Sequence, residues 1–218
     1  MKKLVVAIDG PAGAGKSTVA QLAAKELGYT YIDTGAMYRA VAWKTLQMSQ
    51  PVTDELIVEV VKNIQVLLEY KAGKTAVYVD GQDVSGEIRT PEVTAIVSQV
   101  AALGPVRTKM VELQREMATK GGVLMDGRDI ATNVLPNADV KIFLTASIET
   151  RAIRRFKEME SKGYKVDLAE LQKDIAARDK ADSEREISPL VQAEDAELLD
   201  TSSMNIEEVV EAILQRCR

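Results

Sequence analysis

The sequence predicts an α/β protein in which helices flank a parallel β-sheet, and three observations support this fold class. The apolar run at residues 4–8 is typical of a strand that is buried on both faces, as strands of parallel sheets are. A glycine-rich loop and then a helical pattern follow this run directly. Further apolar runs alternate with helical patterns along the 218 residues, a length sufficient for one domain with a good core.

The glycine-rich loop fits the pattern G-x-x-x-x-G-K-[ST], which is the P-loop that binds nucleotide phosphates. Its glycines allow a tight curl in which backbone N–H groups point at phosphate oxygens, and a helix beginning near Gly15 adds its positive dipole end. Lys16 is expected to reach the β- and γ-phosphates, and the Ser17 hydroxyl to bind Mg²⁺. The alternative, a glycine turn that binds nothing, is disfavoured by the strand–loop–helix setting. The expected triphosphate-binding residues are Gly10, Pro11, Ala12, Gly13, Ala14, Gly15, Lys16, Ser17 and Thr18.

The segments after the loop keep the α/β pattern until a hairpin interrupts it. Glycine just past a helical pattern is a typical stop, threonine is a typical helix cap, and Asp80-Gly81 is typical of a tight turn. The expected elements are a helix ending at Gly28, a strand at 29–33, a helix opening at Thr34, a helix capped by Thr53 that runs to about 62, and an antiparallel hairpin at 66–84 with a turn around Gly73.

The second half of the chain returns to alternating helices and strands. Thr90-Pro91 has the residue types of an N-cap and first helical position, and Gly104-Pro105 separates two helical patterns. The expected elements are helices at 91–103 and from 105 to the Gly121-Gly122 pair, strands at 123–125, 140–144 and 196–199, a long helical stretch at 147–185, and a closing amphipathic helix around 206–213.

The composition excludes several classes of chemistry. The chain has no histidine and one cysteine, Cys217, so Ser-His-Asp and Cys-His nucleophile systems, His-ligated zinc and intramolecular disulfides are excluded. The net charge of −5 gives no basic field for nucleic acid. The first apolar run stops at Asp9, too short for a signal peptide, and no stretch is long enough for a membrane span. We therefore expect a cytoplasmic protein. Its chemistry must use Lys, Arg, carboxylates and Mg²⁺, and this set suits phosphoryl transfer.

Arginines concentrate in the long helical stretch between the last two strands. Five of the twelve arginines of the chain lie there. Arg178, Asp182 and Arg185 are spaced so that a continued helix would put all three on one face. One interpretation is a solvated surface helix; the interpretation that a P-loop favours is a lid whose arginines close over the triphosphate. Asp126 and Asp129 follow another strand, at the sheet edge where ligands of open α/β sheets bind.

Four segments then carry a resemblance in chain order between the P-loop and Leu199-Asp200. They are Asp33-Thr34-Gly35-Ala36-Met37-Tyr38-Arg39, Asp83-Val84-Ser85-Gly86-Glu87-Ile88-Arg89, Ser98-Gln99-Val100-Ala101 and Asp126-Gly127-Arg128-Asp129. Together with the P-loop they resemble bacterial cytidylate kinases, which are P-loop nucleoside monophosphate kinases. The resemblance covers nearly the whole chain, and the hairpin at about 66–84 resembles the enlarged monophosphate-binding region of that family. Some members have Ser at the position of Thr34; this chain keeps the hydroxyl, and the extra methyl group of threonine narrows the pocket.

The resemblance implies a role for each matching residue. It assigns Thr34 and Arg39 to the CMP side, Ser98, Arg107 and Asp129 to the cytosine ring, Arg128 and Arg185 to the CMP phosphate, Arg178 and Asp182 to the ribose, and Arg151 and Arg155 to the ATP phosphates. The expected catalytic set is Lys16, Arg128, Arg151, Arg155 and Arg185. The expected division is a core of 1–33, 121–146 and 190–218, a monophosphate-binding region of 34–120 with its β insertion at about 64–89, and a helical lid of 147–189.

The resemblance implies ATP-dependent, Mg²⁺-assisted phosphorylation of CMP and dCMP by direct in-line transfer. We expect a monomer with no nucleic-acid or membrane partner. Two alternatives stay open from the residues: a kinase for a sugar acid or another monophosphate on the same scaffold, and a non-enzymatic nucleotide switch or partner-binding ATPase. A switch that reads guanine would carry N-K-x-D, which this sequence lacks, and would have no use for an arginine-rich lid.

Overall fold

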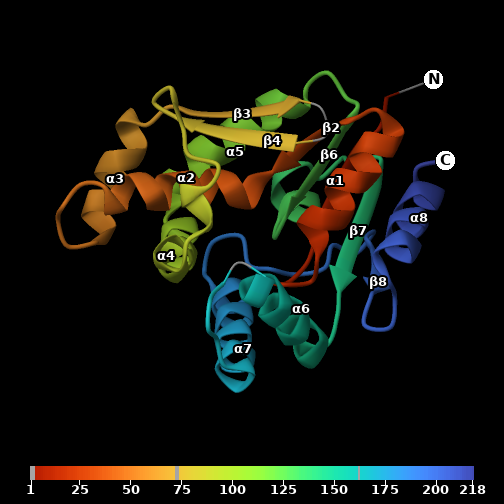
Figure 1. Cartoon of the computed structure of the whole chain (residues 1–218). Helices are drawn as coiled ribbons and strands as arrows, with labels where there is room; N and C mark the ends of the chain where they lie inside the picture. Colours follow the sequence, from red (N-terminus) through yellow and green to blue (C-terminus); the bar gives the residue numbers. More distant parts are fainter. Residues whose placement is uncertain (1–2, 72–73, 162) are drawn as a thin grey trace.

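The computed structural model describes residues 3–71, 74–161 and 163–218 and confirms the α/β fold class (Figure 1). Five parallel strands form the central sheet in the order β2-β6-β1-β7-β8. Their bounds are β1 Val5–Asp9, β2 Thr30–Asp33, β6 Val123–Gly127, β7 Val140–Thr145 and β8 Glu197–Asp200. The first and last strands lie one residue later than the sequence predicts. In this sheet β1, which leads into the P-loop, lies between β6 and β7, so loops from three strands meet around it.

Helices cover both faces of this sheet because the alternate side chains of β1 are apolar in both directions. Val6 and Ile8 pack with α1 (Lys16–Leu27) and the closing helix α8 (Ile206–Arg216), whereas Ala7 packs with α5 (Gly104–Ala118) on the other face. Gly28 adopts φ 66° at the end of α1, as its position after the helical pattern predicts. Across the described residues, none of the helices is both long and apolar enough to cross a lipid bilayer.

The region from α2 to α5 has a hydrophobic core of its own, built by helices against a small sheet. Its elements are α2 Thr34–Leu46, α3 Asp54–Asn63, β3 Val66–Lys71, β4 Lys74–Val79, β5 Gln82–Asp83, the 3₁₀ turn η1 Glu87–Arg89, α4 Pro91–Ala102 and α5. The strands β3, β4 and β5 form the expected antiparallel insertion. The turn around Gly73 lies outside the described residues. Thr53 and Thr90 cap α3 and α4 through their side-chain oxygens, as predicted.

The arginine-rich stretch forms two helices, α6 (Ile148–Ser161) and α7 (Leu168–Glu184), which lie side by side below the sheet in Figure 1. The prediction that α7 continues through Arg185 is wrong by one residue, because Arg185 is its C-cap with extended ψ of 142°. The sequence also gave no sign of the π-helical turn η2 (Ile130–Val134) that follows β6. Both features lie at the candidate site.

Candidate active site

The P-loop runs from the end of β1 to the start of α1, in a conformation that only glycine permits at its first position. Gly10 has φ 150°, and a Cβ there would lie 1.9 Å from the carbonyl oxygen of Leu144 in β7. Gly15 is the N-cap of α1 at φ 87°. The loop therefore passes against the neighbouring strand, and the free N–H groups of the first turn of α1 face the loop, where an anion can bind.

Cationic side chains hold the carbonyl oxygens of this loop. Lys16 Nζ donates to the carbonyl oxygens of Gly10 and Pro11 at 2.7 and 2.8 Å. From α6, Arg151 Nη1 donates to Ala12 O at 2.9 Å and Arg154 Nη1 to Ala14 O at 3.1 Å. Arg154 also donates to two oxygens of Thr201, from Nη1 to Oγ1 at 3.1 Å and from Nη2 to the carbonyl oxygen at 2.6 Å. Sequence reasoning gave Arg154 no individual role; its i,i+3 spacing from Arg151 was the one available signal.

Arg151 and Arg155 do not project together over the P-loop in this structure. Arg151 is buried, and its guanidinium is bound to Ala12 O, to Ala146 O at 2.9 Å and to Asp179 of α7 at 2.7 Å. Arg155 pairs with Glu158 on the surface of α6 at 2.9 Å and lies near the charges of Arg39 and Arg178. Of the two, Arg155 is the arginine with a partly exposed side chain, and its only ion pair is with a neighbour on the same helix among the contacts of the described residues.

Oxygen ligands for a hard cation meet beside the P-loop. The Ser17 hydroxyl donates to Asp126 Oδ2 at 3.1 Å, and Tyr31 donates to Asp126 Oδ1 at 2.7 Å. Burial and the nearby charge of Asp33 raise the pKa of Asp126 to about 6. In the described ranges, no three carboxylates, cysteines or histidines form a metal-binding group. Ser17 and Asp126 are the residues that could hold Mg²⁺, which prefers oxygen ligands. Sequence reasoning placed Asp126 at the ligand-binding edge and gave it no such role.

The charge state of Lys16 depends on what fills the loop. Burial, and then the nearby Arg128 guanidinium, lower the pKa of Lys16 to about 7. Triphosphate oxygens favour the ammonium form and raise this pKa on binding.

We therefore expect ATP binding at pH 8 to take up a proton, because Lys16 is mostly neutral in the free protein at that pH and charged in the complex. The uptake approaches about one proton per ATP at pH 8. Calorimetric binding enthalpies in Tris and in HEPES, which differ in ionisation enthalpy, measure it. Equal enthalpies in the two buffers would contradict the neutral state of Lys16.

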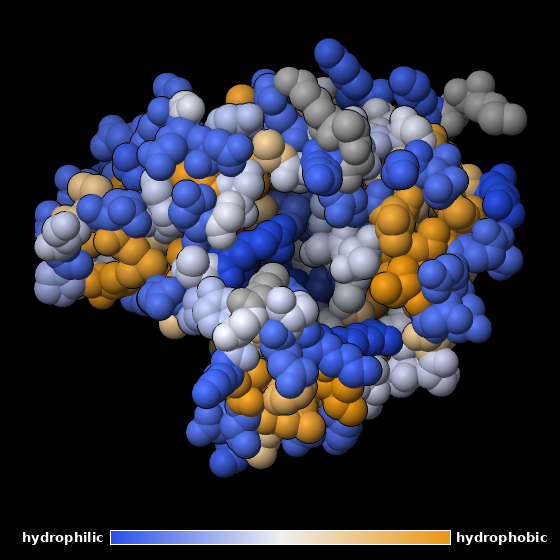
Figure 2. All heavy atoms as spheres, in the orientation of Figure 1, coloured by the Kyte–Doolittle hydropathy of each residue, from blue (hydrophilic) through white to orange (hydrophobic). Residues whose placement is uncertain are grey.

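Beside the P-loop, a pocket lies between the edge of the sheet and the helices α2, α4 and α7. Figure 2 shows a hydrophilic hollow in the middle of the molecular face that it displays. The pocket brings together eight of the nine residues expected to bind the monophosphate: Thr34, Ser98, Arg107, Arg128, Asp129, Arg178, Asp182 and Arg185. The ninth, Arg39, is not part of the lining and donates to Ile88 O and to Thr94 Oγ1 at 3.3 and 2.8 Å. The lining also contains Tyr38, and it contains four residues that the sequence did not single out: Gly35, Val97, Ala101 and Gly127.

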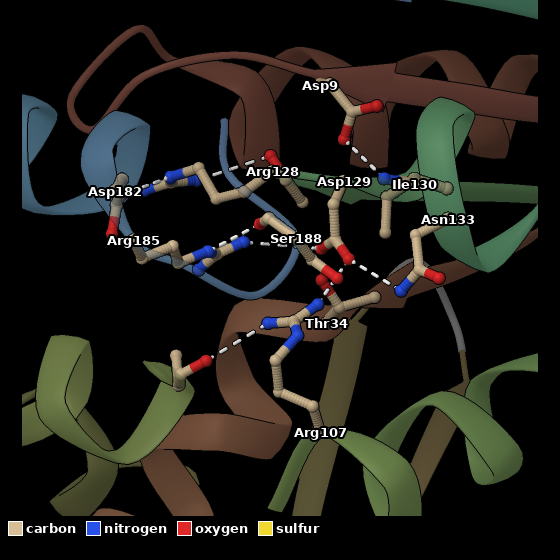
Figure 3. A network of polar contacts seen from close by, with 12 residues as sticks. Asp9, Thr34, Arg107, Arg128, Asp129, Ile130, Asn133, Asp182, Arg185 and Ser188 are labelled. Carbon is tan, nitrogen blue, oxygen red and sulfur yellow. Dashed lines mark hydrogen bonds and ion pairs between the residues drawn. The ribbon is translucent and has the colours of Figure 1, made fainter. Parts of the chain in front are cut away.

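Asp129 is the centre of the polar network at the closed end of this pocket (Figure 3). Its Oδ2 contacts Arg107 Nη2 and accepts from Asn133 Nδ2 at 3.0 Å, while its Oδ1 lies 3.7 Å from Arg185. Asp9 holds this segment in place by accepting the N–H groups of Ile130 and Ala131, both at 2.8 Å. The η2 turn therefore follows a segment that places the Asp129 carboxylate in the pocket, with Oδ2 on Arg107 and Asn133 and Oδ1 facing Arg185.

Arginines line the opposite end of the pocket and lie toward the P-loop. Arg128 pairs with Asp182 at 2.9 Å, and although burial opposes the charge, Arg128 and Arg178 hold the pKa of Asp182 below its usual value. Burial and the Arg128 charge lower the pKa of Arg178 to about 10. Among the described residues, Arg107 Nε, Arg178 Nε and Arg185 Nη2 are buried with no hydrogen-bond acceptor. Unpaired guanidinium donors in one pocket indicate an anionic, polar ligand.

A P-loop with its lysine, facing an arginine-lined pocket across the edge of a parallel sheet, defines a P-loop kinase that acts on a small anionic acceptor. Two solved structures share the fold: an uncharacterised protein from Eubacterium ventriosum (TM-score 0.54, 14% identity, 98% of this chain and 97% of that one) and a gluconokinase from Sinorhizobium meliloti (TM-score 0.50, 15% identity, 98% and 90%). At these identities the likeness shows the fold alone.

The sequence comparisons are more specific than the fold. The family description "Cytidylate kinase" matches residues 6–218. Proteins named cytidylate kinase from Bacillus thuringiensis and Bacillus cereus are each 54% identical to this chain over 214 residues, covering 98% of it and 95% of each relative. The chain therefore belongs to the cytidylate kinase family and is a kinase, as the resemblance in its sequence implies.

Proposed function

We propose that the protein transfers the γ-phosphoryl group of ATP to the phosphate of CMP and dCMP, with the P-loop as donor site and the arginine-lined pocket as acceptor site. Membership of the cytidylate kinase family supports phosphorylation of CMP by ATP. The observation that carries the residue assignment is the pocket itself: Arg107 and Asp129 lie at one end, and Arg128, with its neighbour Lys16, at the other. Arg128 of the acceptor pocket lies close enough to Lys16 of the donor site to lower the pKa of Lys16. The two sites are therefore adjacent, as transfer of a phosphoryl group between them requires.

On the donor side, the residues of the P-loop bind and neutralise the triphosphate. The N–H groups at the start of α1 bind phosphate oxygens, and Lys16 exchanges its two backbone acceptors for the β- and γ-phosphates. Ser17 and Asp126 are the residues that would hold Mg²⁺, which supplies charge neutralisation between the phosphates. Because the expected transition state is loose, positioning and positive charge are the main contributions of the protein.

On the acceptor side, no general base is required. The phosphate of a nucleoside monophosphate has a second pKa near 6 and is mostly dianionic at neutral pH, so it is already a nucleophile. This agrees with a chain without histidine. Arg128 binds and orients that phosphate, so that its oxygen attacks in line with the bond that breaks. Arg185, whose guanidinium lies 3.7 Å from Asp129 in the free protein, would turn from this carboxylate to join Arg128 at the phosphate. The lid helices exclude water, which would otherwise compete for the γ-phosphoryl group.

At the closed end of the pocket, the base is selected by complementary hydrogen bonds. Asp129 Oδ1 is the acceptor for the N4 amino group of cytosine, and Arg107, with an unpaired Nε, is the donor for the O2 and N3 edge. Uracil presents an O4 acceptor to the same carboxylate, which repels it. Ser98 contributes a hydroxyl to this wall of the pocket.

We expect Asp129→Asn to lower kcat/KM for CMP and to move the CMP/UMP preference about ten- to a hundredfold toward one, because an amide can donate to uracil O4. Asparagine is chosen because it keeps the size of the side chain and an oxygen acceptor for Arg107, whereas alanine would leave a cavity and no hydrogen-bond partner there. Parallel kinetics with CMP and UMP measure the ratio. An unchanged ratio in a folded variant would assign base recognition to another residue.

Three finer assignments belong to the same proposal. Acceptance of dCMP requires that the ribose be held without its 2′-hydroxyl, and Arg178 and Asp182 are the residues proposed there. Mg²⁺ at Ser17 is supported by the adjacent Asp126 carboxylate. A monomeric state and a cytoplasmic location are proposed from the sequence, the latter from its single cysteine.

Binding measurements without catalysis test the acceptor assignment. Calorimetric titration with CMP, UMP, cytidine and CDP, in the absence of ATP, separates base from phosphate recognition. We expect CMP to bind more tightly than UMP and far more tightly than cytidine, because both ends of the pocket are polar and buried. Equal binding of CMP and cytidine would contradict the role of the arginines at the phosphate end.

A further inference from the structure

Asp179 lies on α7 between residues of the two sites and touches neither substrate site itself. Its Oδ2 is 2.7 Å from Arg151 Nη2, while its neighbours Arg178 and Asp182 line the acceptor pocket. Arg151 carries the contact on toward the P-loop through Nη1 and Ala12 O, at 2.9 Å. A continuous chain of polar contacts therefore joins α7 to the loop that binds the triphosphate.

The peptide bond that Arg151 holds is one that matters for phosphate binding. The carbonyl of Ala12 and the N–H of Gly13 belong to the same planar unit and point in opposite directions. Fixing the carbonyl against α6 therefore turns the Gly13 N–H away from α6. Gly13 has φ 73°, and glycine crosses between conformations at little steric cost, so this peptide is free to flip unless its carbonyl is held.

The guanidinium of Arg151 can hold that carbonyl because three acceptors fix its plane. Nε donates to Ala146 O, Nη1 to Ala12 O, and Nη2 pairs with Asp179. Asp179 is the only charged member of this set, and charge-assisted bonds to a planar guanidinium are the strongest and most directional of the three. Without it, Arg151 keeps two neutral acceptors and loses the partner that sets its rotation.

We propose that Asp179 is a positioning residue for the P-loop: by fixing Arg151 it keeps the Ala12–Gly13 peptide in the orientation that binds the triphosphate. The inference rests on the proposed function in assigning ATP to this loop. If Asp179 has this role, the donor site is fully formed only when α7 is packed against α6. The residues of α7 that line a substrate site nevertheless all belong to the acceptor pocket.

Asp179→Asn tests the proposal, since it removes the charge and keeps the size. We expect ATP binding, measured by calorimetry without CMP, to weaken about tenfold, and CMP binding to stay within about twofold. Asp174→Asn, an exposed carboxylate on the same helix, is the matched control and should change neither. If the wild-type protein fails to bind ATP, the proposed function fails; if it binds and the variant binds equally well, this inference alone fails.

A double-mutant cycle separates positioning from general support of α7. With Arg151→Ala in place, Asp179→Asn should weaken ATP binding no further, because the two residues act through one contact. Additive effects, or an equal loss of CMP binding, would show that Asp179 only anchors α7 and would overturn the proposal. Should Asp179→Asn not fold, Arg151→Lys decides: an ammonium cannot hold three acceptors, so the same ATP-specific loss is expected, and its absence contradicts the inference.

Discussion

Replacing Lys16 with alanine is expected to reduce kcat by at least about 10³-fold. Lys16 is the lysine of the P-loop motif, and its amino group is expected to bind the β- and γ-phosphates. The fold should survive, because burial makes the Lys16 ammonium costly and lowers its pKa to about 7. Steady-state kinetics with ATP and CMP, together with circular dichroism and thermal melting, measure both expectations.

Lys25→Ala is the matched control for this substitution. Lys25 lies in the same helix α1 and is exposed to solvent, so its loss should leave kcat within about twofold. If the Lys16→Ala protein kept most of its turnover, the assignment of Lys16 and the P-loop to the triphosphate would be contradicted.

Arg155→Ala is expected to lower kcat by about 10³-fold or more and to leave ATP affinity within a few-fold, as for arginines that stabilise a phosphoryl-transfer transition state. The structure directs this expectation to Arg155 because Arg151 and Arg154 are already bound to P-loop carbonyls. The ion pair of Arg155 with Glu158 is a surface i,i+3 pair, so thermal stability should hardly change.

Single-turnover measurements with saturating ATP and CMP isolate the chemical step for this variant. Lys157→Ala, which removes an exposed cation from the same helix, is the control for nonspecific loss of charge. A single-turnover rate within tenfold of wild type would make Arg155 an ordinary surface residue and would leave the lid without a catalytic arginine.

Much of the fold could be predicted from local signals in the sequence. The apolar run before the P-loop, the glycine after α1 and the threonines before α3 and α4 each act within a few residues, so their patterns can be recognised directly. The antiparallel hairpin was predictable for the same reason. The turn η2 was not, because its π-helical geometry depends on Asp9, more than a hundred residues earlier, accepting two of its N–H groups.

The candidate site divides in the same way. The P-loop residues follow from the motif alone, and the acceptor residues were reached through the resemblance, not through spacing. The hydrogen bonds from Arg151 and Arg154 to carbonyl oxygens of the P-loop could not be predicted, because they require α6 to pack against a loop about 140 residues earlier in the chain. The Ser17–Asp126 contact likewise depends on β6 lying beside β1, which only the order of strands in the sheet determines.

Phosphorylation of CMP by ATP is tested directly by an ADP-release assay of the wild-type protein with ATP, Mg²⁺ and one of five acceptors: CMP, dCMP, UMP, AMP or gluconate. We expect the highest kcat/KM for CMP, with dCMP next, UMP about ten- to a hundredfold lower, and no turnover above background for AMP or gluconate. Phosphorus NMR of the CMP reaction should show CDP as the product. Gluconate or AMP as the preferred acceptor, or ADP release that no acceptor stimulates, would contradict the assignment of the pocket to a cytidine monophosphate.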